Sequence, residues 1–230
     1  MGNLIGVGLY TPAEAGRLLD VPAGKISRWL RGHKAGGKSY EPLWQPEIDL
    51  GDGKFQLGFR DLMEVRVAAA FINYGVSALK VRAAIREAAE IIQQGHPLST
   101  NRFRTDGREI FLHVIEEGED GEDRERLLNL FKRQYEFNGV IDPILKTVDF
   151  GDDGNPAAWW PRGRRVHVMV TPNRAFGAPI DSVSSVPTSI LANVAKAQGI
   201  AATAKAYNVT ELSIRHALDF EASLEQRQAA

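Results

Sequence analysis

The sequence predicts an α+β fold that is mainly helical, with short strands between its helical parts. Apolar residues recur every three or four positions near both ends of the chain, which indicates amphipathic helices. Between these helices lie short alternating segments that flank glycine-rich turns, a pattern typical of β-hairpins. We therefore expect a helical domain with a hairpin at residues 1–95, a β-rich connecting region at 96–165 and a helical module at 166–230.

The composition excludes several classes of protein. Of 230 residues, 43% are hydrophobic and 25% are charged, which is ordinary for a soluble globular protein. The absence of cysteine excludes disulfides, thiolate metal sites and cysteine nucleophiles. No apolar run is long enough to cross a bilayer, and the first 12 residues lack the pattern of a secretory signal. We expect a cytoplasmic protein with no membrane association.

The N-terminal domain begins with two predicted helices. Thr11, Pro12 and Glu14 form a capping-box pattern, and an apolar stripe follows as far as Leu19. A second short helix covers residues 25–31, with apolar positions at 26, 29 and 30. Two short helices joined by a few turn residues are typical of a helix-turn-helix unit.

A hairpin and two longer helices complete this domain. Residues 33–42 are predicted to be a glycine- and lysine-rich loop, and the alternating segments on either side of Gly51–Gly53 predict the hairpin. Helical spacing then predicts helices at 59–75 and 77–94. Ser77 is the expected cap of the second one, whose apolar face is Leu79, Val81, Ile85 and Ile92.

The middle and C-terminal regions differ in pattern. The Asp106-Gly107 pair predicts a hairpin over residues 103–114. A short helix is predicted at residues 126–132, and strands are predicted at 137–150 and 164–170. From Pro187 onward the periodicity is helical, with three segments at 187–199, 200–207 and 210–227. Thr210 is the expected cap of the last helix.

The net charge of −1 conceals a strong segregation of charge. Residues 17–38 carry six cations against one acid, a local charge of about +5, whereas residues 116–126 carry seven acids against two arginines. A merely solvated helix face carries mixed signs, yet residues 23–38 hold no acid. This predicts a DNA-binding surface. The expected contacts are Arg17, Lys25, Ser27, Arg28, Arg31, Lys34, Lys38, Tyr40 and Lys54.

The sequence shows no convincing catalytic or metal motif. The five histidines are scattered, and no phosphate-binding loop or nucleophile motif is present. Asp149, Asp152 and Asp153 are the only candidate for magnesium binding, but they lie in a glycine-rich turn where aspartate is expected for backbone reasons. We expect no cofactor, no metal and no enzymatic activity.

The N-terminal region resembles the winged-helix domain of MerR-type regulators. The matching positions are Val21, Ile26, Trp29, Phe59, Asp61, Leu62, Gly75 and Ser77. Ser27 stands where that family has an arginine, and a longer glycine-rich loop precedes the wing. The resemblance implies DNA binding through the second helix, with Lys25 and Arg28 as the expected base contacts.

The C-terminal region resembles the C-terminal module of VapB-type antitoxins. The matching positions are Phe176, Gly177, Pro179, Pro187, Thr188, Leu191, Gly199, Ala204, Tyr207, Val209, Ile214, Ala217, Leu218, Phe220 and Glu221. The resemblance implies a type II antitoxin that neutralises a PIN-like ribonuclease toxin by direct contact. It also implies repression of the protein's own operon, as a homodimer bound to double-stranded operator DNA.

The final helices are assigned to protein contact. Acids outnumber cations toward the chain end, which would repel phosphate. The candidate toxin-binding or dimerisation residues are Arg174, Phe176, Asn208, Glu211, Arg215 and His216. Of these, Arg174, Asn208, Glu211, Arg215 and His216 are expected to be exposed. Two alternatives remain open. One is a stand-alone MerR-like regulator that senses a small ligand near Trp159, Trp160, Arg162, Arg164 and Arg165, and the other is a metal-dependent nuclease.

Overall fold

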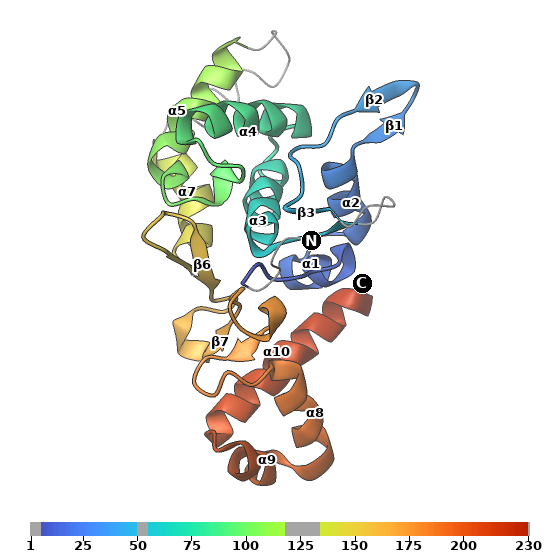
Figure 1. The fold of residues 1–230 in the computed structure, drawn as a ribbon, viewed down its shortest axis with the longest axis vertical. Coiled ribbons are helices and arrows are strands. Elements are labelled where there is room, and N and C mark those ends of the chain that lie inside the picture. Colours follow the sequence, from blue (N-terminus) through green and yellow to red (C-terminus); the bar gives the residue numbers. More distant parts are fainter. Residues whose placement is uncertain (1–5, 50–54, 118–133, 230) are drawn as a thin grey trace.

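A computed structural model of the chain describes residues 6–49, 55–117 and 134–229. These residues form a mainly helical α+β fold with a few two-stranded antiparallel sheets. The first helices lie beside the end of the last helix, and the middle helices and the C-terminal module lie at opposite ends of the molecule (Figure 1). None of the described helices is long and apolar enough to cross a membrane.

The chain begins with α1 (Pro12–Leu19) and α2 (Ala23–Arg31), joined by a tight turn. The predicted capping box is confirmed, because the Glu14 backbone N–H donates to the Thr11 hydroxyl and the Thr11 N–H donates to the Glu14 carboxylate. The turn needs glycine at position 16, where a Cβ would lie 2.6 Å from the Val21 carbonyl oxygen.

Two hairpins follow α2, although the sequence predicted only the second. The predicted loop at 33–42 contains β1 (His33–Ala35) and β2 (Lys38–Tyr40), so that prediction was wrong. Gly36 and Gly37 both have positive φ, the conformation that a two-residue hairpin turn requires. The second hairpin, β3 (Ile48–Asp49) with β4 (Phe55–Gln56), is confirmed, but Lys54 lies outside the described residues.

Both predicted long helices are present as α3 (Phe59–Asn73) and α4 (Ala78–Ile92). Ser77 caps α4 by accepting from the Lys80 backbone N–H at 3.3 Å. Leu79 was wrongly expected on the buried face, since its side chain is 58% exposed. It lies two positions from the buried Val81, about 200° away around the helix.

The middle region is largely helical, not β-rich. It contains η1 (Pro97–Ser99), α5 (Phe103–Glu117) and α7 (Gln134–Leu145). The predicted hairpin at 103–114 was wrong, because Phe103, Ile110 and Phe111 are buried at helical spacing and Gly107 lies against the Phe103 ring. The strand predicted at 137–150 was wrong over α7, and the helix predicted at 126–132 lies outside the described residues.

Short strands connect this region to the C-terminal module. The strands are β5 (Val148–Phe150), β6 (Pro156–Trp159), β7 (Val168–Met169) and β8 (Ile180–Asp181), which pair as β5–β6 and β7–β8. Single turns of 3₁₀-helix lie between them, η2 (Arg164–Val166) and η3 (Ala175–Gly177). The strand predicted at 164–170 is therefore reduced to β7.

The three predicted C-terminal helices are α8 (Thr188–Gln198), α9 (Ile200–Tyr207) and α10 (Glu211–Ala229). The Thr210 hydroxyl accepts from the Ser213 backbone N–H at 3.0 Å, which confirms the predicted cap. The C-terminal half of α10 leaves this module and contacts α1 (Figure 1).

The buried side chains form two hydrophobic clusters. The larger one includes Tyr10, Val170 and Phe71, and Phe71 lies against three other phenylalanine rings of α5 and α7. The smaller one lies between α8, α9 and α10. Phe220 and Leu224 of α10 belong to the larger cluster, so the last helix contributes to both.

Candidate functional site

The predicted DNA-contacting residues other than Lys54 lie on α1, α2 and the β1–β2 hairpin. The apolar side of α2 is buried, with Ile26 0%, Trp29 7% and Leu30 3% exposed. We define the basic surface by its six cations, and none of them has a carboxylate within ion-pair distance among the described residues. They are Arg17, Lys25, Arg28, Arg31, Lys34 and Lys38.

Two cations of the basic surface contact aromatic rings. Lys25 Nζ lies 5.1 Å from the Trp29 ring centroid, and the Arg31 guanidinium lies 4.7 Å from that of Phe55. Such contacts hold a cation over a ring face and leave part of its donor capacity available. Arg28 is exposed and makes no such contact among the described residues. Arg28 is therefore the most accessible of the predicted base-contacting side chains.

The β1–β2 hairpin projects away from the body of the molecule beyond α2 (Figure 1). His33 and Tyr40 are paired across the hairpin, and their rings stack with centroids 4.8 Å apart. Gly32 has φ +70°, and a Cβ there would lie 2.3 Å from the Tyr40 carbonyl oxygen. This close approach fixes the hairpin, with exposed Lys34 and Lys38, against the end of α2.

A buried carboxylate lies beneath this region at the start of α3. Asp61 is fully buried and accepts from the Trp44 indole at 2.8 Å and from the backbone N–H groups of Glu47 and Gly58 at 2.9 Å. Nε2 of His96 lies 2.7 Å from Oδ1 of Asp61, the oxygen that also accepts from the Trp44 indole. The sequence marked Asp61 only through the MerR resemblance and gave no sign of these partners.

A second buried carboxylate lies one turn further along α3. Glu64 accepts from the backbone N–H groups of Leu98 and Ser99 at 3.1 and 2.9 Å, so it joins α3 to η1. Burial raises the pKa of Glu64 to about 7, against the opposing effects of the His96 charge and these hydrogen bonds. Burial lowers the pKa of His96, but the hydrogen bond and charge of Asp61, with Glu64 and Glu47, outweigh it and raise that pKa overall.

The predicted toxin-binding or dimerisation residues do not form one continuous set. Phe176 is 68% exposed at η3, and Arg174 beside it donates to the Ser185 hydroxyl. Asn208 has φ +53° and ends α9, which gives it a structural role. Glu211 and Arg215 form an exposed pair on α10 with 3.5 Å between nitrogen and oxygen.

His216 was expected to be exposed, but the structure places it differently. Its side chain is half-buried and stacks on His167, with ring centroids 6.2 Å apart. Its Nδ1 is buried without a hydrogen-bond partner among the described residues. The expectation of an exposed His216 was therefore wrong.

The segment around Phe176 is tied to the N-terminus of the chain. The Leu9 backbone N–H donates to the Phe176 carbonyl at 2.9 Å, and the Tyr10 hydroxyl donates to the Gly177 carbonyl at 2.8 Å. Phe176 has φ +52°, an unusual conformation for a bulky residue. These contacts hold the backbone of the segment in place, and the Phe176 ring is exposed on it.

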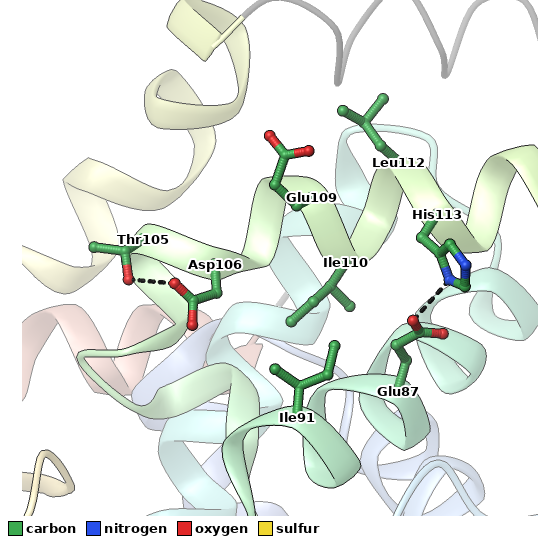
Figure 2. A pocket seen from close by; sticks show the side chains of 8 residues that line it. All are labelled: Glu87, Ile91, Thr105, Asp106, Glu109, Ile110, Leu112 and His113. Carbon is green, nitrogen blue, oxygen red and sulfur yellow. Dashed lines mark hydrogen bonds and ion pairs between the residues drawn. The ribbon is translucent and has the colours of Figure 1, made fainter.

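A hollow of about 560 Å³ lies between α4 and α5 (Figure 2). Its acidic side chains already have partners, because Glu87 lies 2.7 Å from His113 and Asp106 accepts from Thr105. Glu109 likewise accepts from Arg108. Among the described residues, no group of acids and histidines is arranged to hold a metal ion.

Two of the three aspartates that the nuclease alternative requires have separate roles. Asp149 accepts from the Trp160 indole at 2.7 Å and pairs with Arg164. Asp153 accepts from the Asn155 backbone N–H at 3.0 Å, as expected for a turn. Hydrogen bonds from Asn155 hold the pKa of the Asp153 carboxyl below its usual range.

The fold of the chain is similar to that of a protein of known structure. The crystal structure of Rv2018 from Mycobacterium tuberculosis superposes with a TM-score of 0.69 and 24% identity, covering 94% of this chain and 99% of that one. The chain therefore has the fold of that protein over almost its whole length.

The amino-acid sequence of the chain is also similar to that of a described protein. The chain is 27% identical over 225 residues to a protein described as putative antitoxin VapB45, from the same organism, with 93% of each chain covered. No family model matches the chain.

Proposed function

We propose that this protein is the antitoxin of a type II toxin–antitoxin system. It binds and neutralises a PIN-like ribonuclease toxin, and it represses its own operon by binding operator DNA as a homodimer. The observation that carries the proposal is the similarity to a putative VapB antitoxin, which extends over 93% of both chains.

The basic surface supports the DNA-binding half of the proposal. Its six cations have no carboxylate partner among the described residues, so their charge is available to phosphate. The α2 helix has a buried apolar side and exposed Arg28 and Arg31, the arrangement that a groove-reading helix needs. The β1–β2 hairpin would add phosphate contacts through Lys34 and Lys38.

The exposed side chains of the C-terminal part support the toxin-binding half. Phe176 and Leu212 are 68% and 54% exposed, and aromatic side chains are over-represented among the residues that dominate protein interfaces. The Glu211–Arg215 pair is also exposed and can contribute to the polar rim of an interface. We assign Phe176 as the principal toxin contact.

A co-expression experiment tests this function. The gene adjacent to this one, cloned under an inducible promoter, is expected to arrest growth, and expression of this chain is expected to restore it. A matched variant carrying Lys25→Ala and Arg28→Ala should still restore growth, because neutralisation does not require the basic surface. If the neighbouring product is harmless, or if this chain leaves its toxicity unchanged, the proposal is wrong.

A ligand-sensing regulator is the second candidate function, and one observation favours it. Trp159 and Arg162, two residues of that alternative, line a cavity beside α1. Trp160 and Arg164 instead contact Asp149. A regulator of this kind would change its operator affinity when ligand is added, without any protein partner.

A further inference from the structure

A small cavity of about 180 Å³ lies where the N-terminal helices meet α10 and the end of β6. Three arginines from distant parts of the sequence line it, together with two aromatic rings and one hydroxyl. They are Arg66 of α3, Arg162 after β6, Arg227 of α10, Trp159, Phe220 and Ser223. The remaining lining residues are apolar, and no acid is among them.

The guanidinium group of Arg66 is partly buried, and no carboxylate lies within ion-pair distance of it among the described residues. Its guanidinium donates to the Ile144 carbonyl at 3.0 Å and to the Thr147 hydroxyl at 2.9 Å, and it lies 4.9 Å from the Trp159 ring centroid. All three contacts are to neutral groups, so none offsets the charge as a carboxylate would. Burial lowers the pKa of Arg66 to about 10, which leaves it cationic at neutral pH.

The other two arginines are also without acidic partners. Arg162 lies 5.9 Å from the Phe220 ring centroid, and its side chain is exposed. Arg227 donates from one nitrogen to the carbonyls of Arg17 and Leu18 at the end of α1, which leaves its other donors unassigned. None of the three guanidinium groups has a carboxylate within ion-pair distance among the described residues.

Taken one at a time, the contacts of these three arginines have structural explanations, because arginine packs on aromatic rings and interacts favourably with the C-terminal end of a helix. Three cations around one small cavity without any acid are not explained in this way, because like charges repel. An anion in the cavity would offset all three charges. Guanidinium groups match the geometry of phosphate oxygens, and the Ser223 hydroxyl supplies a further polar group.

We propose that this cavity binds a small doubly charged oxyanion of the phosphate class. The ligand is either free phosphate or the phosphoryl group of a small metabolite. Because Arg227 also holds the end of α1, an anion here would strengthen the contact between α10 and the N-terminal helices. This site is separate from the basic surface and from Phe176, and its existence does not depend on the proposed antitoxin role.

Calorimetric titration of the full chain with inorganic phosphate tests the site, alongside thermal unfolding in phosphate and in sodium chloride of equal ionic strength. Phosphate should raise the unfolding temperature more than chloride does. Arg162→Ala should weaken phosphate binding at least tenfold while the variant stays folded, because this side chain is exposed. Arg165→Ala removes an exposed arginine that does not line the cavity and should change the affinity less than twofold.

Glycerol 2-phosphate as a second titrant distinguishes the two sources of the ligand. Binding of both compounds supports a site open to phosphate esters, and binding of phosphate alone supports a site for the free anion. The proposal is overturned if phosphate stabilises the chain no more than chloride. It is equally overturned if Arg165→Ala weakens binding as much as Arg162→Ala, since the effect would then be one of general charge.

Discussion

Nε2 of His96 lies 2.7 Å from the Asp61 carboxylate, and both side chains are buried. The two residues are 35 positions apart, and their contact joins the start of α3 to the segment that leads into η1. Asp61 also accepts hydrogen bonds from the Trp44 indole and the Glu47 backbone N–H, and both residues belong to the segment that joins the two hairpins. This contact therefore connects the part of the chain that carries the basic surface to the middle helices.

The His96–Asp61 contact predicts that stability falls as pH rises from about 6.5, the pKa of histidine in the unfolded chain. The pKa of His96 is raised in the folded state, so its contribution is fully present below the unfolded value of about 6.5 and is lost above it. The pKa of Glu64, raised to about 7, acts in the same direction. Urea unfolding at several pH values measures this slope. His96→Gln should flatten it, and a stability that rises over this range would contradict the assignment.

Removal of the Asp61 carboxylate should be strongly destabilising. Asp61→Ala removes the acceptor of an indole N–H and of two backbone N–H groups, and it removes the partner of a buried histidine. We expect a loss of about 3–5 kcal/mol in the free energy of unfolding. Asp152→Ala, at an exposed position, should stay within about 0.5 kcal/mol of the original chain. Equal effects of the two substitutions in urea titrations would refute this role.

The junction between α2 and the β1–β2 hairpin should tolerate only glycine. Gly32→Ala introduces a Cβ 2.3 Å from the Tyr40 carbonyl oxygen at φ +70°, and we expect a cost of about 2 kcal/mol or more. Gly24→Ala is the matched control, because no atom lies within 4 Å of its Cβ and it is inside α2. That change should stabilise the chain by about 0.5–1 kcal/mol. Thermal unfolding of both variants measures the difference.

Substitution on α2 should weaken DNA binding in a salt-dependent way. Lys25→Ala with Arg28→Ala is expected to reduce affinity for the chain's own promoter fragment at least tenfold and to lower the salt slope by about 2. Fluorescence anisotropy at several salt concentrations measures both quantities. Lys205→Ala removes an exposed cation of α9 and should leave both unchanged. An unchanged salt slope in the double variant would show that DNA lies elsewhere.

Local patterns in the sequence were sufficient for most of the helices. The capping box at Thr11, the Ser77 and Thr210 caps and the C-terminal helices all depend on residues a few positions apart. The hairpin expected at 103–114 failed because Asp106-Gly107 was given more weight than the helical spacing of the surrounding apolar residues. Conversely, Gly36-Gly37 is a strong local signal for the β1–β2 hairpin, in the segment that was predicted to be a loop.

The buried polar and cationic clusters could not be predicted in the same way. Asp61 meets partners 3, 14, 17 and 35 positions away, and no local pattern records such distances. The arginine cavity brings together α3, the segment after β6 and α10. Of its three arginines only Arg162 was singled out from the sequence, through its proximity to Trp159 and Trp160. Such sites depend on tertiary packing, which periodicity does not specify.

Direct inhibition of a purified toxin tests the central claim. The protein encoded by the adjacent gene is expected to cleave RNA alone and to lose that activity near an equimolar amount of this chain, and the two proteins should co-elute in gel filtration. Phe176→Ala should weaken inhibition at least tenfold and leave stability almost unchanged, because the ring is 68% exposed. Undiminished cleavage in excess of this chain, with no co-elution, would contradict the antitoxin assignment.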